Sequence, residues 1–285
     1  MFRVLTLDKI SELGIDRFPN SDYEVGNAVE NPDAILVRSR DMHKEAIPLA
    51  VKAVGRAGVG VNNIPIGKMS RNGIAVFNTP GANANAVKEL VIGSLVIASR
   101  QIGEAWDFVR SLSGIDEDIV KLVEEGKKRY VGFELQGRVL GVIGLGVIGR
   151  AVANAADTLG MKVVGFDPNV TVEGAWQLSA NVQRAKNLEE LLAQADFLTL
   201  HVPLDEKTRG LINFRSLEVV KKGVVILNFA REGIVNDEAI EAALDSGSVF
   251  SYVSDFPNNL LRNHKRVVML PHLGASTGEA EDNCA

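Results

Sequence analysis

The residues with the clearest chemical potential are two histidines and one arginine, each placed just past a short apolar run. His272 lies in MLPHLGAST, His201 lies in TLHVPL, and Arg231 directly follows VVILNFA. A histidine can transfer a proton near neutral pH, and the planar guanidinium of an arginine can bind a carboxylate. Taken singly, each histidine is more typical of a structural residue, and the arginine fits a solvated loop equally well.

Other common chemistries lack the residues that they need. The four histidines show no metal-ligand spacing, and the single cysteine, Cys284, excludes both an internal disulfide framework and a zinc signature. No GxSxG motif is present, which disfavours a serine hydrolase. We therefore expect no metal site.

A glycine-rich loop gives the strongest single signal. Gly144, Gly146 and Gly149 form a GxGxxG pattern that follows the apolar run VLGVIG and opens a helical segment. The next apolar run ends in an acidic residue, Asp167, at the spacing typical of a dinucleotide-binding fold. These features predict that the loop binds a pyrophosphate and that Asp167 binds a ribose, which favours NAD over NADP. A turn needed only for packing is the alternative.

Two loops in the first third of the chain could bind an anion. The stretch VRSRD places Arg38, Ser39 and Arg40 just past an apolar run. The glycine cluster GRAGVGVNN could present backbone N–H groups to a carboxylate. A solvated charged turn is the alternative for the first loop. From its residues alone the second loop is better interpreted as a plain turn.

Apolar runs alternate with amphipathic segments along nearly the whole chain. Strands are predicted within residues 3–7, 33–39, 51–58 and 74–80, one long helix within 83–112, and a second strand series within 139–271. Continuous apolar strands separated by helices indicate parallel sheets covered on both faces. The sequence thus predicts an α/β protein with two doubly wound parallel-sheet domains facing a cleft.

Composition bounds the class of protein. The chain has 285 residues, 46% hydrophobic and 24% charged, which is typical of a globular protein with two domains. A net charge of −5 disfavours a surface for nucleic acid or anionic membranes. No apolar run approaches the length of a membrane span, and the first residues lack the apolar core of a signal peptide. We expect a cytoplasmic protein that binds neither nucleic acid nor membrane.

A series of motifs resembles those of the D-isomer-specific 2-hydroxyacid dehydrogenases. In chain order they are LVRSRD, GRAGVGVNNI, VFNTPGANANAVKEL, LGVIGLGVIG, GFDP, LHVPL, NFAREGIVNDEAI, YVSDFPN and PHLGASTGEAEDNCA. The resemblance is closest to members that oxidise D-3-phosphoglycerate to 3-phosphohydroxypyruvate at the start of serine biosynthesis. It implies a Rossmann-type NAD-binding domain, residues 91–272, inserted in a flavodoxin-like substrate-binding domain, residues 1–90 with 273–285 returning towards it.

The resemblance also implies roles in catalysis and substrate binding. Arg231 would bind the substrate carboxylate and carbonyl, and His272 would move the hydroxyl proton while hydride passes to the nicotinamide. Backbone N–H groups of the 57–60 loop would bind the carboxylate. The remaining implied substrate contacts are the phosphate-binding Arg38, Ser39 and Arg40, and within the loop Gly58, Val59 and Gly60.

The implied contacts to NAD come from the strand ends of the second domain. The segment predicted as one long helix would form a homodimer interface through this domain. The residues implied to contact NAD are Gly144, Gly146, Val147, Ile148, Gly149, Asp167, Val202, Pro203, Phe229, Ala230, Arg231, Asp255, His272, Gly274 and Ala275.

The sequence departs from the family at two places. Family members usually carry a glutamate that hydrogen-bonds the histidine, four or five residues past the aspartate matching Asp255, where this chain has Asn259 and Leu260. An asparagine can orient the ring but supplies no charge, so we expect His272 to favour the base role, in hydroxyacid oxidation. Family members also continue past an end such as EDNCA, and some add a regulatory domain, so we expect no serine-sensing domain within this sequence.

Two other functions stay open. The first is another dehydrogenase of the family, acting on glycerate, lactate or a sugar acid. The RSR cluster disfavours this alternative, because it indicates a phosphorylated substrate. The second is an NAD(H)-sensing binding protein with little turnover. The presence of both Arg231 and His272 disfavours the sensor.

Overall fold

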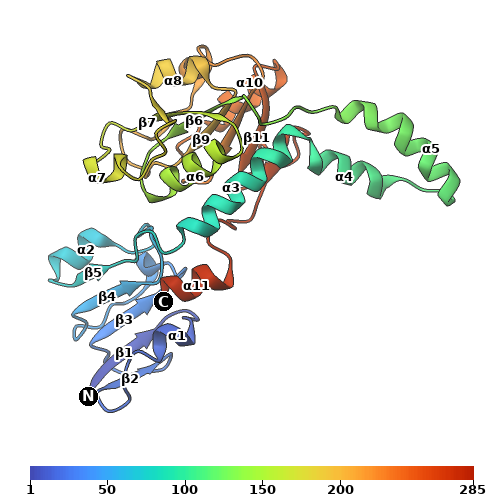
Figure 1. The fold of residues 1–285 in the computed structure, drawn as a ribbon. Helices are drawn as coiled ribbons and strands as arrows, with labels where there is room; N and C mark the ends of the chain where they lie inside the picture. Colours follow the sequence, from blue (N-terminus) through green and yellow to red (C-terminus); the bar gives the residue numbers. More distant parts are fainter. The chain divides into compact units, whose positions relative to one another are not determined.

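The computed structural model describes residues 1–285, which form two compact units. The first unit contains Met1–Ala86 and Ala275–Ala285, and the second contains Val87–Gly274 (Figure 1). The chain leaves the first unit inside helix α3 (Ala84–Ser99), slightly before residue 90. None of the helices is both long and apolar enough to cross a membrane.

The first unit is built on a five-stranded parallel sheet. The strand order is β2-β1-β3-β4-β5, which is the flavodoxin-like order with its switch point between β1 and β3. The second strand in the chain was not predicted, because YEVG is short and has no buried residue. The strands are β1 (Phe2–Thr6), β2 (Tyr23–Gly26), β3 (Ala34–Val37), β4 (Ala53–Arg56) and β5 (Ala75–Phe77).

Short helices complete this unit, including two from opposite ends of the chain. Helices α1 (Glu12–Ile15) and α11 (Gly278–Cys284) contact each other, whereas α2 (Ile66–Arg71) precedes β5 and the 3-10 helix η1 (Met42–Lys44) follows β3. A Cβ on Gly14 would lie 2.6 Å from the Cβ of Ala285, so the two segments meet where only glycine fits. The Ser11 hydroxyl donates to Asp282 at 2.5 Å.

The second unit is built on a seven-stranded parallel sheet of order β12-β11-β10-β9-β6-β7-β8. This is the Rossmann order with one additional strand. All five residues of β10 are buried, as expected for a central parallel strand. The strands are β6 (Val139–Ile143), β7 (Lys162–Phe166), β8 (Gln183–Arg184), β9 (Phe197–Leu200), β10 (Val224–Asn228), β11 (Val249–Ser254) and β12 (Val267–Met269).

Helices cover both faces of this sheet, which confirms the predicted α/β class with parallel sheets. Helices α3 and α6 (Val147–Thr158) pack on one face, and α8 (Leu188–Gln194) and α10 (Asp237–Asp245) pack on the other. Along the central strand β10, side chains alternate between these two cores. The short α7 (Val172–Ala175) and α9 (Phe214–Leu217) lie in connections.

The prediction of one long helix over residues 83–112 is wrong. The helix breaks between α3 and α4 (Ile102–Ser111), where Gln101 adopts a left-handed conformation with φ 49°. The carbonyl of Ser99 accepts the N–H of Phe133, so a distant segment completes the end of α3. Helix α4 has no buried residue, and α5 (Asp116–Gly126) and the 3-10 helix η2 (Lys127–Tyr130) follow it.

Candidate functional site

The three glycines after β6 differ in what an added side chain would meet. Gly144 has φ 91°, and a Cβ there would lie 2.5 Å from the His201 carbonyl oxygen. A Cβ on Gly149 would overlap the carbonyl oxygen of Gly144. A Cβ on Gly146, the N-cap of α6, would meet nothing within 4 Å. The loop is therefore packed against protein at its first and third glycines and open at its second, where a phosphate can approach the helix N-terminus.

Asp167 follows β7 and braces this glycine loop. One carboxylate oxygen accepts the N–H of Leu145 at 2.8 Å, and the other accepts the N–H of Asn169 at 2.8 Å. Each carboxylate oxygen can accept a further hydrogen bond, so the carboxylate is fixed in place and still able to bind ribose hydroxyls.

Arg150 is a candidate cofactor residue that the sequence analysis missed. Its guanidinium donates to the carbonyl of Leu145 at 2.7 Å and to the side chain of Gln177 at 3.2 Å. It therefore places a cation beside the loop in the first turn of α6. Its position directly after the last glycine of the motif could have identified it.

The other residues implied to contact NAD differ in exposure. Val147 is 48% exposed and Pro203 is exposed, whereas the side chains of Phe229 and Ala230 belong to the buried core. Only the backbones of Phe229 and Ala230 can therefore face a ligand. Ile148 and Val202 are half-buried and pack against the cores.

His201 lies at the end of β9, beside the glycine loop. Burial lowers the pKa of His201 to about 3, and its Nε2 lies 2.9 Å from the hydroxyl of Thr199. The ring is consequently neutral at any ordinary pH. Its backbone oxygen forms the wall behind Gly144, so the geometry favours a structural histidine.

Three residues from the sequence analysis follow three neighbouring strands of the seven-stranded sheet. Arg231 comes after β10, Asp255 after β11 and His272 after β12. The Asp255 N–H donates to Asn228 O at 3.1 Å, and the His272 N–H donates to Asp255 O at 3.1 Å. The three residues thus lie along one carboxyl-terminal edge, where open α/β sheets bind their ligands.

Arg231 is a half-buried cation to which no carboxylate is paired. Its Nη1 donates to the carbonyl of Ala230 at 2.5 Å, and Asn228 holds the Arg231 carbonyl at 3.0 Å. Burial lowers the pKa of Arg231, yet a guanidinium remains protonated in proteins. Such a cation is well suited to an anionic ligand.

Asp255 fixes the turn that carries His272. Its buried carboxylate accepts the N–H of Leu273 at 2.7 Å and that of Gly274 at 2.8 Å. His272 is exposed, with a left-handed φ of 55°, and its ring lies edge-on to Phe256 with centroids 5.3 Å apart. Phe256 was missed, although its place directly after Asp255 was a usable signal. Asn259 and Leu260 are both exposed.

The predicted phosphate-binding loop of the five-stranded unit is charge-balanced within that unit. Arg38 pairs with Glu281 of α11 at 3.0 Å and donates to the carbonyl of Ala275 at 3.5 Å. Arg40 pairs with Glu45 at 3.6 Å. An incoming anion must therefore compete with carboxylates for both arginines, while the exposed Ser39 lies between them.

The loop after β4 presents backbone donors. Gly58 has φ 149°, and the guanidinium of Arg56 occupies the place of a Cβ there. The Val59 carbonyl accepts from Asn78 at 2.6 Å, while the N–H groups of Val59 and Gly60 make no hydrogen bond within the chain. Those two N–H groups are available to a carboxylate.

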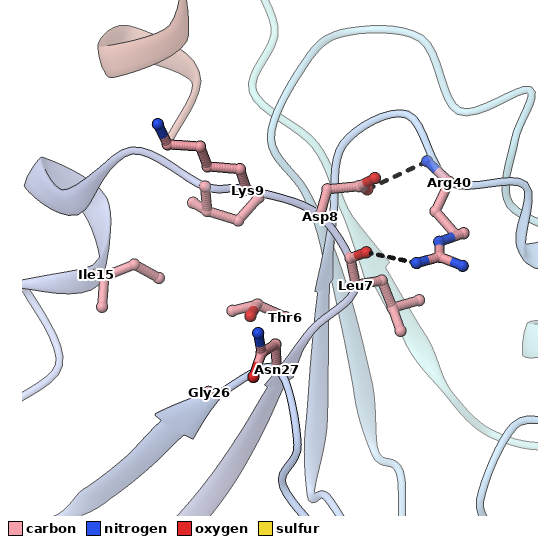
Figure 2. A pocket seen from close by; sticks show the side chains of 9 residues that line it. Thr6, Leu7, Asp8, Lys9, Ile15, Gly26, Asn27 and Arg40 are labelled. Carbon is pink, nitrogen blue, oxygen red and sulfur yellow. Dashed lines mark hydrogen bonds between the residues drawn. The ribbon is translucent and has the colours of Figure 1, made fainter.

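A cavity of about 730 Å³ lies at the carboxyl ends of β1 and β2, and Arg40 borders it (Figure 2). No residue of the 57–60 loop contributes to it. The lining residues are Thr6, Leu7, Asp8, Lys9, Ile10, Ile15, Gly26, Asn27 and Arg40.

Comparison with known proteins identifies the seven-stranded unit. Residues 92–274 match the sequence model of the D-isomer specific 2-hydroxyacid dehydrogenase, NAD binding domain. This match covers more than half of the chain and includes the glycine loop, Asp167 and the three strand-end residues.

Relatives extend the similarity to the whole chain. D-3-phosphoglycerate dehydrogenase of Bacillus subtilis is 37% identical over 303 residues, covering 100% of this chain and 55% of the relative. The protein of the same name from Methanocaldococcus jannaschii is 38% identical over 269 residues, covering 90% of this chain and 48% of the relative. The chain thus spans about half the length of these curated relatives.

A solved structure agrees with the fold. The NAD+-bound 3-phosphoglycerate dehydrogenase of Entamoeba histolytica is 24% identical with a TM-score of 0.76, covering 99% of this chain and 91% of that one. At this identity the likeness shows the fold alone. Together with the family match, it confirms the predicted resemblance: the chain carries an NAD binding domain and belongs to the D-isomer-specific 2-hydroxyacid dehydrogenases.

Proposed function

We propose that this chain catalyses the NAD-dependent oxidation of D-3-phosphoglycerate to 3-phosphohydroxypyruvate, the first step of serine biosynthesis. The observation that carries the proposal is the placement of Arg231, a half-buried cation without a carboxylate partner, on the same sheet edge as His272. The names of the curated relatives support the choice of substrate.

The residues of the seven-stranded unit fit NAD. The open space at Gly146 would accept the pyrophosphate, and the fixed carboxylate of Asp167 would bind the ribose. NAD, when bound, supplies the nicotinamide ring that accepts a hydride. Arg231 would bind the substrate carboxylate and stabilise charge at the C2 oxygen. As hydride leaves C2, His272 would take the hydroxyl proton, and a carbonyl forms.

In the five-stranded unit, the N–H groups of Val59 and Gly60 would bind a carboxylate. Arg38, Ser39 and Arg40 would bind the phosphate, with the phosphate replacing Glu281 and Glu45 on the two arginines. These ion pairs also favour a second candidate, an unphosphorylated substrate such as D-glycerate, because the arginines already have partners.

The test is NADH formation with D-3-phosphoglycerate, D-glycerate and D-lactate, and NADH consumption with 3-phosphohydroxypyruvate. We expect turnover with the phosphorylated pair and at least about tenfold lower kcat/KM for the others. A preference for D-glycerate would select the second candidate. Tight NADH binding without turnover of any acid would instead indicate an NAD(H) sensor.

We also propose a homodimer formed through the region of α3 to α5. Trp106, Val109 and Val120 are 62%, 49% and 63% exposed, more apolar surface than two short helices normally leave open. Light scattering should give a dimer for the wild-type protein and a monomer for Trp106→Glu. Trp176→Glu is the control, because Trp176 is 85% exposed but lies in the connection after α7. A wild-type monomer would contradict the proposal.

A cytoplasmic location completes the proposal. Cys284 is a free, buried thiol, which suits a reducing compartment.

A further inference from the structure

The loop of residues 38–40 is held by a carboxylate that the proposed reaction does not use. A single oxygen of Asp8 accepts three consecutive backbone N–H groups, from Arg38 at 2.7 Å, Ser39 at 3.0 Å and Arg40 at 3.1 Å. Figure 2 shows the bond to Arg40. Three N–H groups directed at one point form an anion-binding nest. Asp8 already fills this nest, so the backbone of the loop is not available to a substrate phosphate.

The same loop is held on its carbonyl side by an amide. The Nδ2 group of Asn63 donates to the carbonyl of Arg38 at 3.2 Å and to that of Arg40 at 2.9 Å. Asn63 lies just past the 57–60 loop, so it ties the two predicted substrate loops together. The Arg40 side chain returns to the Leu7 carbonyl at 3.2 Å, beside Asp8 (Figure 2).

These hydrogen bonds fix the backbone positions from which the side chains of Arg38 and Arg40 extend. Arg38 and Arg40 are separated by one residue and turn to different partners, Glu281 and Glu45. A flexible arginine binds an anion well only if its backbone origin is fixed, since each freely rotating side chain loses entropy on binding. Asp8 and Asn63 supply that fixed origin through bonds to backbone groups of the loop.

We propose that Asp8 and Asn63 are positioning residues that give the chain its preference for a phosphorylated over an unphosphorylated hydroxyacid. The inference rests on the proposed function, because it assigns the phosphate to the side chains of the 38–40 loop. The alternative hypothesis is that the three N–H groups of the nest bind the substrate phosphate themselves. Asp8 would then occupy the nest only while no phosphate is bound.

Asp8→Asn and Asn63→Ala in the full chain test the proposal. We expect each variant to lower the ratio of kcat/KM for D-3-phosphoglycerate to that for D-glycerate by about tenfold. Asp8→Asn replaces three hydrogen bonds to a charged oxygen by weaker bonds to a neutral one, and Asn63→Ala removes two hydrogen bonds. The loss should lie in KM, with kcat changed less than about twofold and the Kd for NADH unchanged. Asp8→Glu keeps the charge and should restore part of the ratio.

Two matched controls lie in the same unit. Asp33 accepts the N–H of Arg3 at 2.9 Å near the opposite ends of β1 and β3, so Asp33→Asn removes a carboxylate that also accepts a backbone N–H, away from the loop. Asn62→Ala removes the exposed neighbour of Asn63. Neither control should change the substrate ratio. An equal fall in the controls, or an unchanged ratio in Asp8→Asn and Asn63→Ala, would overturn the proposal.

Two measurements without turnover separate this proposal from the proposed function. Hydrogen exchange of the amides of residues 38–40 should become about tenfold faster in Asp8→Asn and stay unchanged in Asp33→Asn. Inorganic phosphate should bind Asp8→Asn more weakly than wild type; tighter binding would mean that the nest is the phosphate site. If the wild-type protein oxidises no hydroxyacid, the proposed function fails, and exchange and phosphate binding decide the positioning role. If Asp8→Asn does not fold, Asn63→Ala and Asp8→Glu carry the same measurements.

Discussion

The 38–40 loop of the five-stranded unit and the 272–274 turn of the seven-stranded unit use the same device. In each, an aspartate at the end of one strand accepts backbone N–H groups from the segment that follows the neighbouring strand. Asp8 uses one oxygen for three N–H groups and is half-buried, whereas Asp255 uses both oxygens for two and is buried. A carboxylate thus fixes the backbone that presents the charged or titratable side chain in both units.

The units differ in the state of their cations. Arg38 and Arg40 already have carboxylate partners, whereas Arg231 has none. An anion that binds Arg38 and Arg40 replaces the carboxylates already paired with them, so the net gain in binding free energy is small. At Arg231 the anion satisfies a half-buried charge. This difference predicts that Arg231 contributes to every substrate and the loop arginines mainly to discrimination.

The largest expected effect comes from removing the cation without a partner. Arg231→Ala should lower kcat/KM by about 1,000-fold for phosphorylated and unphosphorylated acids alike, because a desolvated charge that stabilises the reacting oxygen is lost. Arg38→Ala should cost about tenfold and only with D-3-phosphoglycerate. Steady-state rates with both acids measure this. If Arg38→Ala lowered kcat/KM equally for both acids, Arg38 would not discriminate between them, and the predicted difference between Arg38 and Arg231 would be wrong.

The next effect concerns the two aspartates. Asp255→Asn places an amide N–H₂ against a buried backbone N–H, so the free energy of unfolding should fall by about 1–3 kcal/mol. Asp8→Asn should cost less, since one oxygen of Asp8 accepts all three N–H groups and the amide oxygen of asparagine can take its place. Urea unfolding followed by circular dichroism gives both values. A larger loss at Asp8 would show that the five-stranded unit depends more on this device.

A smaller effect tests the competition at Arg38. Glu281→Gln removes the carboxylate partner 3.0 Å from Arg38, so KM for D-3-phosphoglycerate should fall by about two- to fivefold at low salt. Glu279→Gln on the same helix is the control. An unchanged KM in Glu281→Gln, measured alongside an unchanged KM for D-glycerate, would mean that Arg38 does not meet the phosphate.

A pH-dependent effect on stability concerns a histidine in each unit. The pKa of His201 is about 3 in the folded chain against an ordinary 6.5, so the unfolded chain binds an extra proton between these values. Stability is therefore unaffected above pH 6.5 and falls as the pH drops towards 3. His201→Gln should lose less of its melting temperature between pH 7 and pH 4 than wild type. His43→Gln, at an exposed position of the other unit, should follow wild type.

The parts of the structure that were predicted are those with a local signal. The buried strands could be predicted because each is an apolar run in the sequence. The glycine loop and Asp167 could be predicted because both belong to one βαβ unit, which fixes their spacing. Strands β2 and β8 were not predicted, because these two edge strands are short and have no buried residue. The break at Gln101 also escaped, since the Phe133 N–H that completes α3 lies far along the chain.

The sequence predicted which residues belong to the candidate site, but it did not predict the ion pairs that these residues form. The sequence alone gives Arg38 and Arg40 no carboxylate partner, yet in the structure Glu281, near the other end of the chain, pairs with Arg38. The roles of Asp8 and Asn63 rest on bonds between loops that no spacing rule connects. Pairing between distant segments depends on the completed fold, and this is why only the structure reveals it.

The contact of Gly14 with Ala285 has a consequence for how the protein is made. A ribosome completes the whole seven-stranded unit, residues 87–274, before it adds the segment that closes the five-stranded unit. Residues 1–86 therefore wait for residues 275–285, and during that wait the contact between α1 and α11 cannot form. The second unit in the sequence is thus the first that the nascent chain can finish.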